Sequence, residues 1–229
     1  MTYVLHYAPD NASLIVRLAL NALDVPFETA LVDRAAHSQR DPAYLALNPN
    51  GLIPTLITPH GPLFETGAIL LWLVDTHGDL GPGTQNSRRA DFLKWLFFCS
   101  NTVHPALQLL FYPHKLVGDD PEACKMVTTG AKRLLRAHFA TLDTAQTSAF
   151  AQTEVTVIDL YIATMLRWCA IYGPEDRTWF SLADTPALAR ICAHVEALPA
   201  TGRAQMAEGL GATPFTAPAR PNPPEGSAL

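Results

Sequence analysis

Two short segments carry residue types that can hold a peptide-like ligand. In the first, Asn48-Pro49-Asn50-Gly51-Leu52-Ile53-Pro54, a proline stands directly before an apolar run. A proline that opens a strand loses no ladder hydrogen bond, and an X-Pro bond adopts the cis form at small cost. We therefore expect a cis Ile53-Pro54 bond. It would turn the N–H and C=O of Ile53 into a cleft, where they can pair with an extended ligand.

The second segment, Phe64-Glu65-Thr66-Gly67, places an acid and a hydroxyl at the expected start of a helix. Free backbone N–H groups and the helix dipole favour a carboxylate ligand at such a place. The α-carboxylate of an amino acid can therefore bind at Thr66, with Glu65 facing the ammonium group. Taken alone, each segment is also compatible with an ordinary strand entry or helix start.

A mixed α/β unit must position these two segments. Short β-branched or aromatic runs predict strands, and a broad apolar face after cap-forming residues predicts the first helix. The predicted strands cover residues 3–7, 25–32, 55–57 and 62–64, and the predicted helices cover residues 14–23 and 66–76. With a polar connection over residues 37–47, the order is β-α-β followed by β-β-α. This order is the thioredoxin-like arrangement.

The character of the sequence changes beyond Gly78. Helices are predicted over residues 88–110, 121–145, 156–169 and 186–198, with no strand between them. We therefore expect a thioredoxin-like domain (1–80), a linker (81–87), an all-α domain (88–208) and a Pro-rich C-terminal tail (209–229). Such a tail either lies over the surface or stays mobile.

In this order, the motifs resemble those of the glutathione transferases. The pattern of that family is a valine or isoleucine followed by cis-proline, then Glu-Ser or Glu-Thr, and it is matched at Ile53-Pro54 and Glu65-Thr66. Thr156 and Asp159 match the capping box that opens the core helix of the family's C-terminal domain, where the role is structural. The likeness covers about residues 1 to 200. It implies the glutathione transferase fold, with a thioredoxin-like domain followed by an all-α helical domain.

The resemblance implies that a group beside the first helix stabilises the glutathione thiolate. A thiol with a pKa near ~8.5 is mostly protonated at neutral pH unless a donor lowers that pKa. The positions that carry serine or cysteine in branches of the family hold Asp10 and Ala12 here, and neither donates in the usual way. The remaining candidates are Ser13 and Asn11, followed by Tyr7. Catalysis by helix N–H groups alone is the alternative.

Further ligand contacts are implied by the same resemblance. His104 lies where a histidine of the bacterial cysteine-type branch faces the glutathione cleft, and Asn101 shares its helix face; the alternative is a histidine satisfied in the core or at an interface. Polar residues of the connection expected to close over the glycine end of glutathione are His37, Gln39, Arg40 and Asn50, while Arg34 and Arg40 are equally compatible with solvated surface charges. The apolar surface expected along the electrophile pocket comes from Phe98, Leu107, Phe111, Tyr112 and Trp168. Tyr112, His114 and Lys115 either line the same pocket or belong to a loop at the end of a helix.

The expected function is attack of the glutathione thiolate on an apolar electrophile, in detoxification, by a cytoplasmic homodimer that needs no metal. One alternative is a glutathione-dependent disulfide or peroxide reductase. Another is a non-catalytic protein that carries ligands or mediates interactions. The last is favoured by Asp10, because a carboxylate at the serine position would repel a thiolate.

Composition excludes several other classes. A net charge of −5, a pI near 5.9 and scattered Lys and Arg residues argue against nucleic acid as a partner. No apolar run approaches the ~20 residues that cross a bilayer, and no signal peptide is recognised. Cys99, Cys124, Cys169 and Cys192 are far apart without metal-ligand spacing, so we expect buried thiols in a reducing compartment.

Overall fold

The computed structural model describes residues 2–145, 147–173 and 178–228; Met1 and Leu229, the ends of the predicted first domain and tail, lie outside this range. Its single mixed sheet has the order β2-β1-β3-β4. The strands are β1 (Tyr3–Tyr7), β2 (Phe27–Leu31), β3 (Thr55–Thr58) and β4 (Gly61–Phe64). β1 runs parallel to β2 and antiparallel to β3, and β3 and β4 form a hairpin. The thioredoxin-like arrangement is confirmed.

Two helices cover this sheet and build its core. α1 (Ser13–Ala22) packs against β1 and against α3 (Thr66–His77), and its apolar side chains from Leu14 to Leu20 are fully buried. The connection after β2 holds a 3₁₀ turn (Ser38–Arg40) and the short α2 (Pro42–Leu45). Pro62 is tolerated in β4 because this strand lies at the sheet edge.

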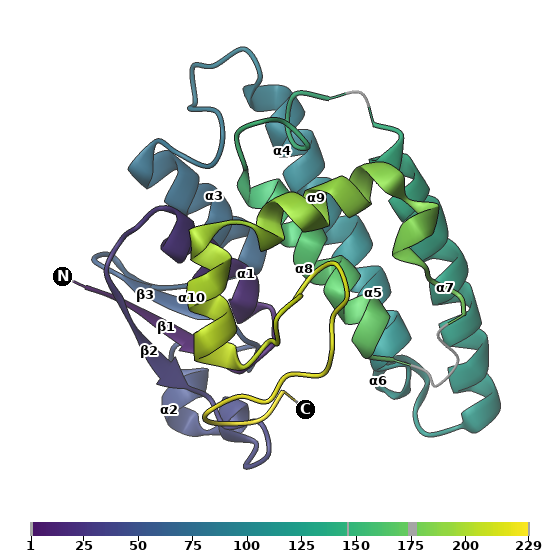
Figure 1. Ribbon diagram of the computed structural model, residues 1–229. Helices are drawn as coiled ribbons and strands as arrows, with labels where there is room; N and C mark the ends of the chain where they lie inside the picture. Colours follow the sequence, from purple (N-terminus) through teal and green to yellow (C-terminus); the bar gives the residue numbers. More distant parts are fainter. Residues whose placement is uncertain (1, 146, 174–177, 229) are drawn as a thin grey trace.

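The remainder of the described chain is helical (Figure 1). Its helices are α4 (Arg89–Phe98), α5 (His104–Phe111), α6 (His114–Val117), α7 (Pro121–Asp143), α8 (Val157–Ile171), α9 (Pro186–Glu196) and α10 (Pro199–Glu208), with a 3₁₀ turn at Leu182–Asp184. α8 is the central helix, since nearly all of its side chains are buried. The predicted capping box is present at its start.

Two helix predictions need correction. The helix expected over residues 88–110 is not regular, because a π-helical turn at Cys99–Val103 separates α4 from α5. Pro105 explains the turn, since proline has no N–H and its ring clashes with the carbonyl four residues earlier. α10 was not predicted after residue 198. It packs against α1 through the short side chains of Ala200, Thr201 and Ala204, which give no amphipathic pattern.

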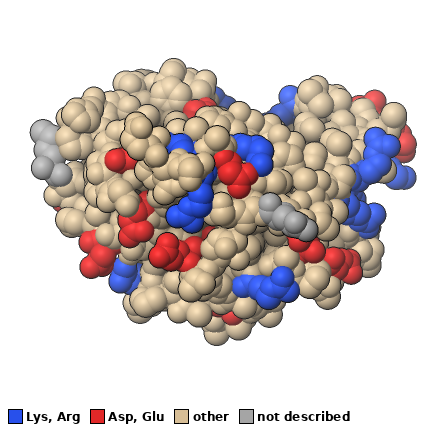
Figure 2. All heavy atoms as spheres, turned by 90° about the horizontal axis from the view of Figure 1, so that it is seen from above, with Lys and Arg blue, Asp and Glu red and all other residues tan. Residues whose placement is uncertain are grey.

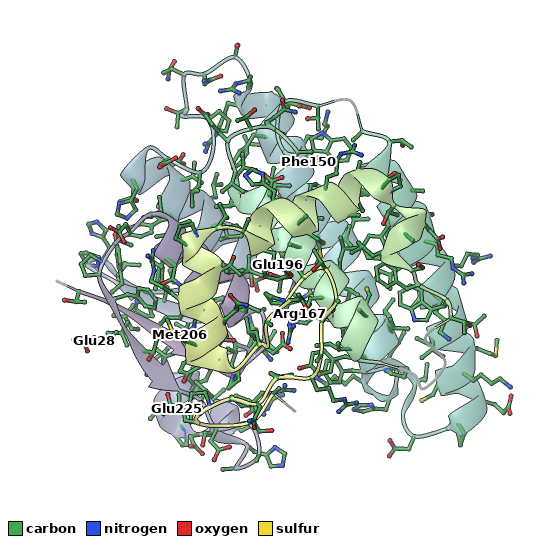
Figure 3. The ribbon with its side chains drawn as sticks, in the orientation of Figure 1. Glu28, Phe150, Arg167, Glu196, Met206 and Glu225 are labelled. Atoms are coloured by element: carbon green, nitrogen blue, oxygen red, sulfur yellow. The ribbon has the colours of Figure 1, made fainter. Side chains whose placement is uncertain are left out.

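The tail lies over the surface and is held by buried charged groups. The guanidinium of Arg167 donates to the carbonyls of Leu210 (3.4 Å), Pro214 (2.9 Å) and Ala219 (3.1 Å). Figure 3 shows Arg167 where α8, α10 and the tail meet. In the same view Glu196 lies near the upper turn of the tail, and Glu225 lies on the lower loop of the tail. Of the two alternatives for the tail, the structure therefore supports an ordered cover.

Charged groups on the surface are mixed. Figure 2 shows acidic and basic side chains interspersed on one face, most of which is neither. Among the residues that the structure describes, no helix is both long and apolar enough to span a membrane. Within the same residues, no group of three or more His, Cys, Asp and Glu side chains is placed to hold a metal ion.

Candidate functional site

A pocket of about 1020 Å³ opens between the sheet-containing part and the helical part of the chain. Both parts line it, since its walls come from the starts of α1 and α3, the connection after β2, α5, α7, α8 and the tail. Seven of the residues expected to bind or activate the ligand face it together: Asn11, Ile53, Pro54, Glu65, Thr66, Asn101 and His104.

One end of the pocket offers groups for an amino acid. The predicted cis bond at Ile53-Pro54 is present. Ile69 is the first residue whose N–H bonds within α3, to the carbonyl of Glu65 at 2.9 Å, so the N–H groups of Thr66 and Gly67 precede it without an intrahelical partner. The side chain of Glu65 is exposed into the same pocket. A carboxylate and a neighbouring ammonium can therefore be held here together.

The connection after β2 supplies a second polar wall. Gln39 Oε1 is buried without a hydrogen-bond partner among the described residues, and Arg40 lies beside it on the pocket. Gly51 packs so closely beneath them that a Cβ there would lie 2.8 Å from the Gln39 carbonyl oxygen. Its φ of +60° also favours glycine. The wall can thus accept an N–H group and bind a carboxylate.

Two residues expected in this wall do not line the pocket. His37 is exposed at the left-handed start of the 3₁₀ turn. Asn50 is exposed, and its N–H donates to Oδ1 of Asn48 at 3.1 Å in a tight turn. Asn48 takes the place expected for Asn50, because it lines the pocket and donates to the Leu52 carbonyl at 2.8 Å.

The three candidate thiol donors lie in different places. Asn11 lines the pocket; its Oδ1 accepts the Ala12 N–H at 2.8 Å, and its Nδ2 has no acceptor among the described residues. Ser13 is fully buried instead. Its hydroxyl donates to the Ala8 carbonyl at 3.0 Å and accepts the Ala8 N–H at 3.3 Å, which turns it away from the pocket.

Tyr7 is also turned away from the pocket. Its hydroxyl donates to Glu225 of the tail, and the guanidinium of Arg17 lies 4.5 Å from the centre of its ring. Burial and the Glu225 carboxylate raise the pKa of Tyr7. Of the two candidates ranked first, Ser13 is thus held by the backbone, whereas Asn11 brings to the pocket a donor that has no acceptor among the described residues.

Asp10 does not face a thiolate as an unpaired charge. Its carboxylate accepts from Arg167 Nε (2.9 Å) and Nη2 (2.8 Å), from Trp168 Nε1 (3.1 Å) and from Tyr172 Oη (2.7 Å). The Asp10–Arg167 pair is fully buried. The residue at the serine position thus joins the start of α1 to α8, and the expectation that it would repel a thiolate is not supported.

A second buried pair completes this junction. Glu208, the last residue of α10, binds Arg17 Nε at 2.6 Å and the Asp10 N–H at 2.7 Å. Burial raises the pKa of Glu208 to about 7, although Arg17 opposes this shift. Sequence reasoning missed Arg167 and Glu208. Arg167 could have indicated a buried ion pair from the sequence, because a lone charge in an otherwise apolar helix requires a buried partner.

His104 lies at the floor of the pocket as a neutral imidazole. Its Nδ1 is 2.7 Å from the Tyr161 hydroxyl, and its ring packs against Tyr161 and Trp168. Burial lowers the pKa of His104 to about 4. His104 can therefore exchange a hydrogen bond with a ligand, but it brings no positive charge to the pocket at neutral pH.

We expect the ring of His104 to stay unprotonated from pH 8 down to about pH 5. Its pKa is about 4 in the folded protein, against 6.5 for an ordinary histidine. Its contribution to stability is therefore complete above pH 6.5 and is lost as the pH falls from 6.5 towards 4. NMR of ¹³C-labelled histidine measures this directly, with His104→Gln assigning the signal. An inflection of that signal above pH 6 would contradict the buried, neutral ring.

The other end of the pocket is apolar and aromatic. The residues expected there that do line it are Leu107, Phe111, Tyr112, Lys115 and Trp168. Tyr172 lines it as well. Two expected residues do not line it. Phe98 packs against Trp95 and His138, with ring centres 5.6 Å apart in each pair, and His114 faces away in the short α6.

The cysteines need one correction. Cys99, Cys169 and Cys192 are buried free thiols, as predicted. Cys124, in contrast, is partly exposed and lines the pocket from the first turn of α7, where its Sγ donates to the Gly118 carbonyl at 3.3 Å.

A family model and several known proteins match this chain in sequence, and they all carry the same family name. Residues 1–75 match the family model of the glutathione S-transferase N-terminal domain. Glutathione S-transferase GST-4.5 of Xanthomonas campestris is 30% identical over 176 residues, which cover 75% of this chain and 84% of that protein. The GST-like protein YncG of Escherichia coli is 29% identical over 174 residues, covering 75% and 82%.

Solved structures agree with the sequence comparisons. A sphingomonad glutathione S-transferase, solved in complex with glutathione, is 30% identical to this chain. The alignment covers 91% of this chain and 100% of that one, with a TM-score of 0.73. The thioredoxin-like sheet followed by helices is thus the architecture of that structure as well.

Proposed function

The chain belongs to the glutathione transferase family, and we propose that it binds glutathione in the pocket and lowers the pKa of the glutathione thiol. In this proposal the γ-glutamyl carboxylate lies at the start of α3 with Glu65 facing its ammonium group. The cysteinyl backbone pairs with Ile53, and Gln39 and Arg40 meet the glycine end. The observation that supports this proposal is that all of these groups line one pocket, together with the free amide of Asn11.

Asn11 is the proposed thiolate donor. Its Nδ2 would donate to the sulfur, and the start of α1 behind it adds the positive end of the helix dipole. The thiol proton passes to solvent, and the thiolate then attacks an electrophilic carbon. A C–S bond forms there while the leaving group departs with its electron pair. The apolar end of the pocket would hold this electrophile.

Asn11→Ala is expected to abolish most of the pKa shift of bound glutathione. In the wild-type protein the thiol pKa should be lowered by a unit or more, and each unit corresponds to about 1.4 kcal/mol. The variant should also lose activity by roughly 10- to 100-fold through kcat, with the Kd of glutathione changed less than about threefold. The measurement is the ultraviolet absorbance of the thiolate during a pH titration of the complex, followed by turnover with a chlorodinitrobenzene probe.

Ser13→Ala is the matched control, because its hydroxyl is bonded to the Ala8 backbone. It should cost stability, by about 1 kcal/mol, without moving the thiol pKa. If instead Ser13→Ala removes the shift and Asn11→Ala does not, the assignment of Asn11 is wrong. Binding without any shift in the wild-type protein would favour the carrier alternative. A shift combined with turnover of disulfides but not of carbon electrophiles would favour the reductase alternative.

The homodimer and the cytoplasmic location expected from the resemblance stay predictions. No finding on this chain favours the reductase or the carrier over the transferase.

A further inference from the structure

We propose that the apolar end of the pocket selects electrophiles that carry an anionic group, such as aromatic carboxylates, and that Arg34 and Lys115 bind this group. The inference rests on the proposed function, which assigns the opposite end of the pocket to glutathione. It names a substrate class for the acceptor side of that same pocket.

The geometry that carries it is centred on Tyr112, at the end of α5. Arg34 Nη2 donates to the Tyr112 hydroxyl at 3.2 Å, and Lys115 Nζ lies 4.2 Å from the centre of the Tyr112 ring. Arg34 Nη1 also donates to the Ala228 carbonyl of the tail at 2.6 Å. Two cations from different elements are thus held beside one aromatic side chain on the pocket wall.

Neither cation is paired with a carboxylate of the residues that the structure describes. The ion pairs formed among the described residues engage other basic residues: Arg17, Arg89, Lys94, Arg167 and Arg203. Within the described ranges, the Arg34 guanidinium donates to two neutral oxygens, and the Lys115 ammonium lies over the ring of Tyr112. Both positive charges are therefore available to a ligand.

The carboxylates near the pocket do not offset these charges. Two acidic residues of the described chain line it, Asp10 and Glu65. Asp10 is paired with Arg167, and Glu65 lies at the start of α3, the end assigned to the ammonium of glutathione. Besides Arg40 at the glutathione end, the basic residues Lys125 and Arg220 line the same pocket. Its acceptor side is therefore positive in a chain whose net charge is −5.

The walls around the two cations suit a planar apolar body. Phe111 lies edge-on to Tyr112 and to Tyr172, with ring centres 6.4 and 6.5 Å apart, and Trp168 lines the pocket deeper, against His104. Aromatic walls bind such a body through stacked or edge-to-face contacts, which leave its rotation within the plane of its own ring unset. A few fixed polar groups usually supply that orientation in ligand pockets, and Arg34 and Lys115 are placed to do so.

The test compares two unreactive ligands that differ in charge, 3,5-dinitrobenzoate and 3,5-dinitrobenzamide. Their binding to the full chain is measured by calorimetry, with and without saturating S-methylglutathione. We expect the wild-type protein to bind the carboxylate at least about tenfold more tightly than the amide, since a charge-assisted hydrogen bond contributes that much or more. Raising the ionic strength should weaken binding of the carboxylate alone.

The Arg34→Gln/Lys115→Gln double variant should bind the carboxylate about tenfold or more weakly and the amide within about threefold of wild type. Arg190→Gln is the matched control. It removes one positive charge from the exposed side of α9, outside the pocket, and should leave both affinities unchanged. The kcat/KM for conjugation of 4-chloro-3,5-dinitrobenzoate should fall in the double variant and stay unchanged in Arg190→Gln. In this reaction the thiolate first forms the C–S bond at the chlorine-bearing carbon, and the C–Cl bond then breaks as chloride leaves with its electron pair.

Two results would overturn the proposal. One is equal affinity of the wild-type protein for the carboxylate and the amide. The other is a double variant that loses affinity for S-methylglutathione and keeps it for the carboxylate, which would assign both cations to the glycine end of glutathione. Absence of S-methylglutathione binding in the wild-type protein would contradict the proposed function instead. In that case the affinities for 3,5-dinitrobenzoate and 3,5-dinitrobenzamide, measured without S-methylglutathione, still test whether the pocket prefers an anion.

Discussion

Asp10→Asn is expected to lower the free energy of unfolding by about 3–5 kcal/mol, the range found when one partner of a buried ion pair is removed. The Arg167 guanidinium is fully buried and would lose its only carboxylate partner among the described residues. Trp168 and Tyr172 would each face a weaker acceptor. Urea-induced unfolding, followed by tryptophan fluorescence, measures the loss.

Asp24→Asn is the control, because it makes the same chemical change at a closely matched backbone position. Both aspartates have a left-handed backbone, with φ of 50° at Asp10 and 52° at Asp24, which asparagine tolerates. Asp24, however, pairs with Arg203 at 3.4 Å while 91% exposed, so we expect no measurable loss. Equal stabilities of the two variants would contradict the importance of the buried pair.

Asp159→Ala should have the second largest effect, a loss of roughly 3 kcal/mol. Its carboxylate accepts from the Ala151 N–H (2.7 Å), the Thr156 N–H (2.8 Å) and the Thr156 hydroxyl (2.8 Å). The two Thr156 donors are buried at the start of α8, and the Ala151 N–H comes from the exposed loop before it. Alanine therefore leaves the Thr156 and Ala151 backbone N–H groups without this acceptor. The same unfolding measurement applies, supplemented by hydrogen exchange at these two amides.

Asp120→Ala separates this effect from ordinary helix capping. Asp120 caps α7 by accepting from Glu122 N–H (2.9 Å) and Ala123 N–H (3.3 Å), but these bonds are exposed. Water can replace an exposed cap, so the loss should be near 1 kcal/mol. Similar losses in Asp120→Ala and Asp159→Ala would mean that burial adds nothing to the capping box of α8.

The features that were predictable from sequence are those coded by neighbouring residues. The cis bond of Ile53-Pro54, the helix start at Glu65-Thr66 and the capping box at Thr156 each depend on a few adjacent side chains. Local propensity and hydrogen-bond geometry act over that distance, so a short pattern is sufficient to recognise them.

The features that were not predictable depend on the path of the backbone between elements or on partners far away in the chain. Ser13 and Asn11 were ranked by residue type alone, and the connection after β1 decides that one hydroxyl meets the Ala8 carbonyl while the neighbouring amide faces the pocket. The placement of Arg34 beside Tyr112 joins residues 78 positions apart. Helix packing sets such pairings, and no spacing in the sequence encodes them.

The junction of Asp10, Arg17 and Tyr7 with the C-terminal part has a consequence for synthesis on the ribosome. Their partners Arg167, Glu208 and Glu225 follow 157, 191 and 218 positions later. At about 5–20 residues per second, the first of them appears roughly 10 to 30 s after Asp10. During that time the emerging sheet and α1 present unmatched charges on an apolar face. We therefore expect the nascent N-terminal half to need hydration or chaperones until the last helix emerges.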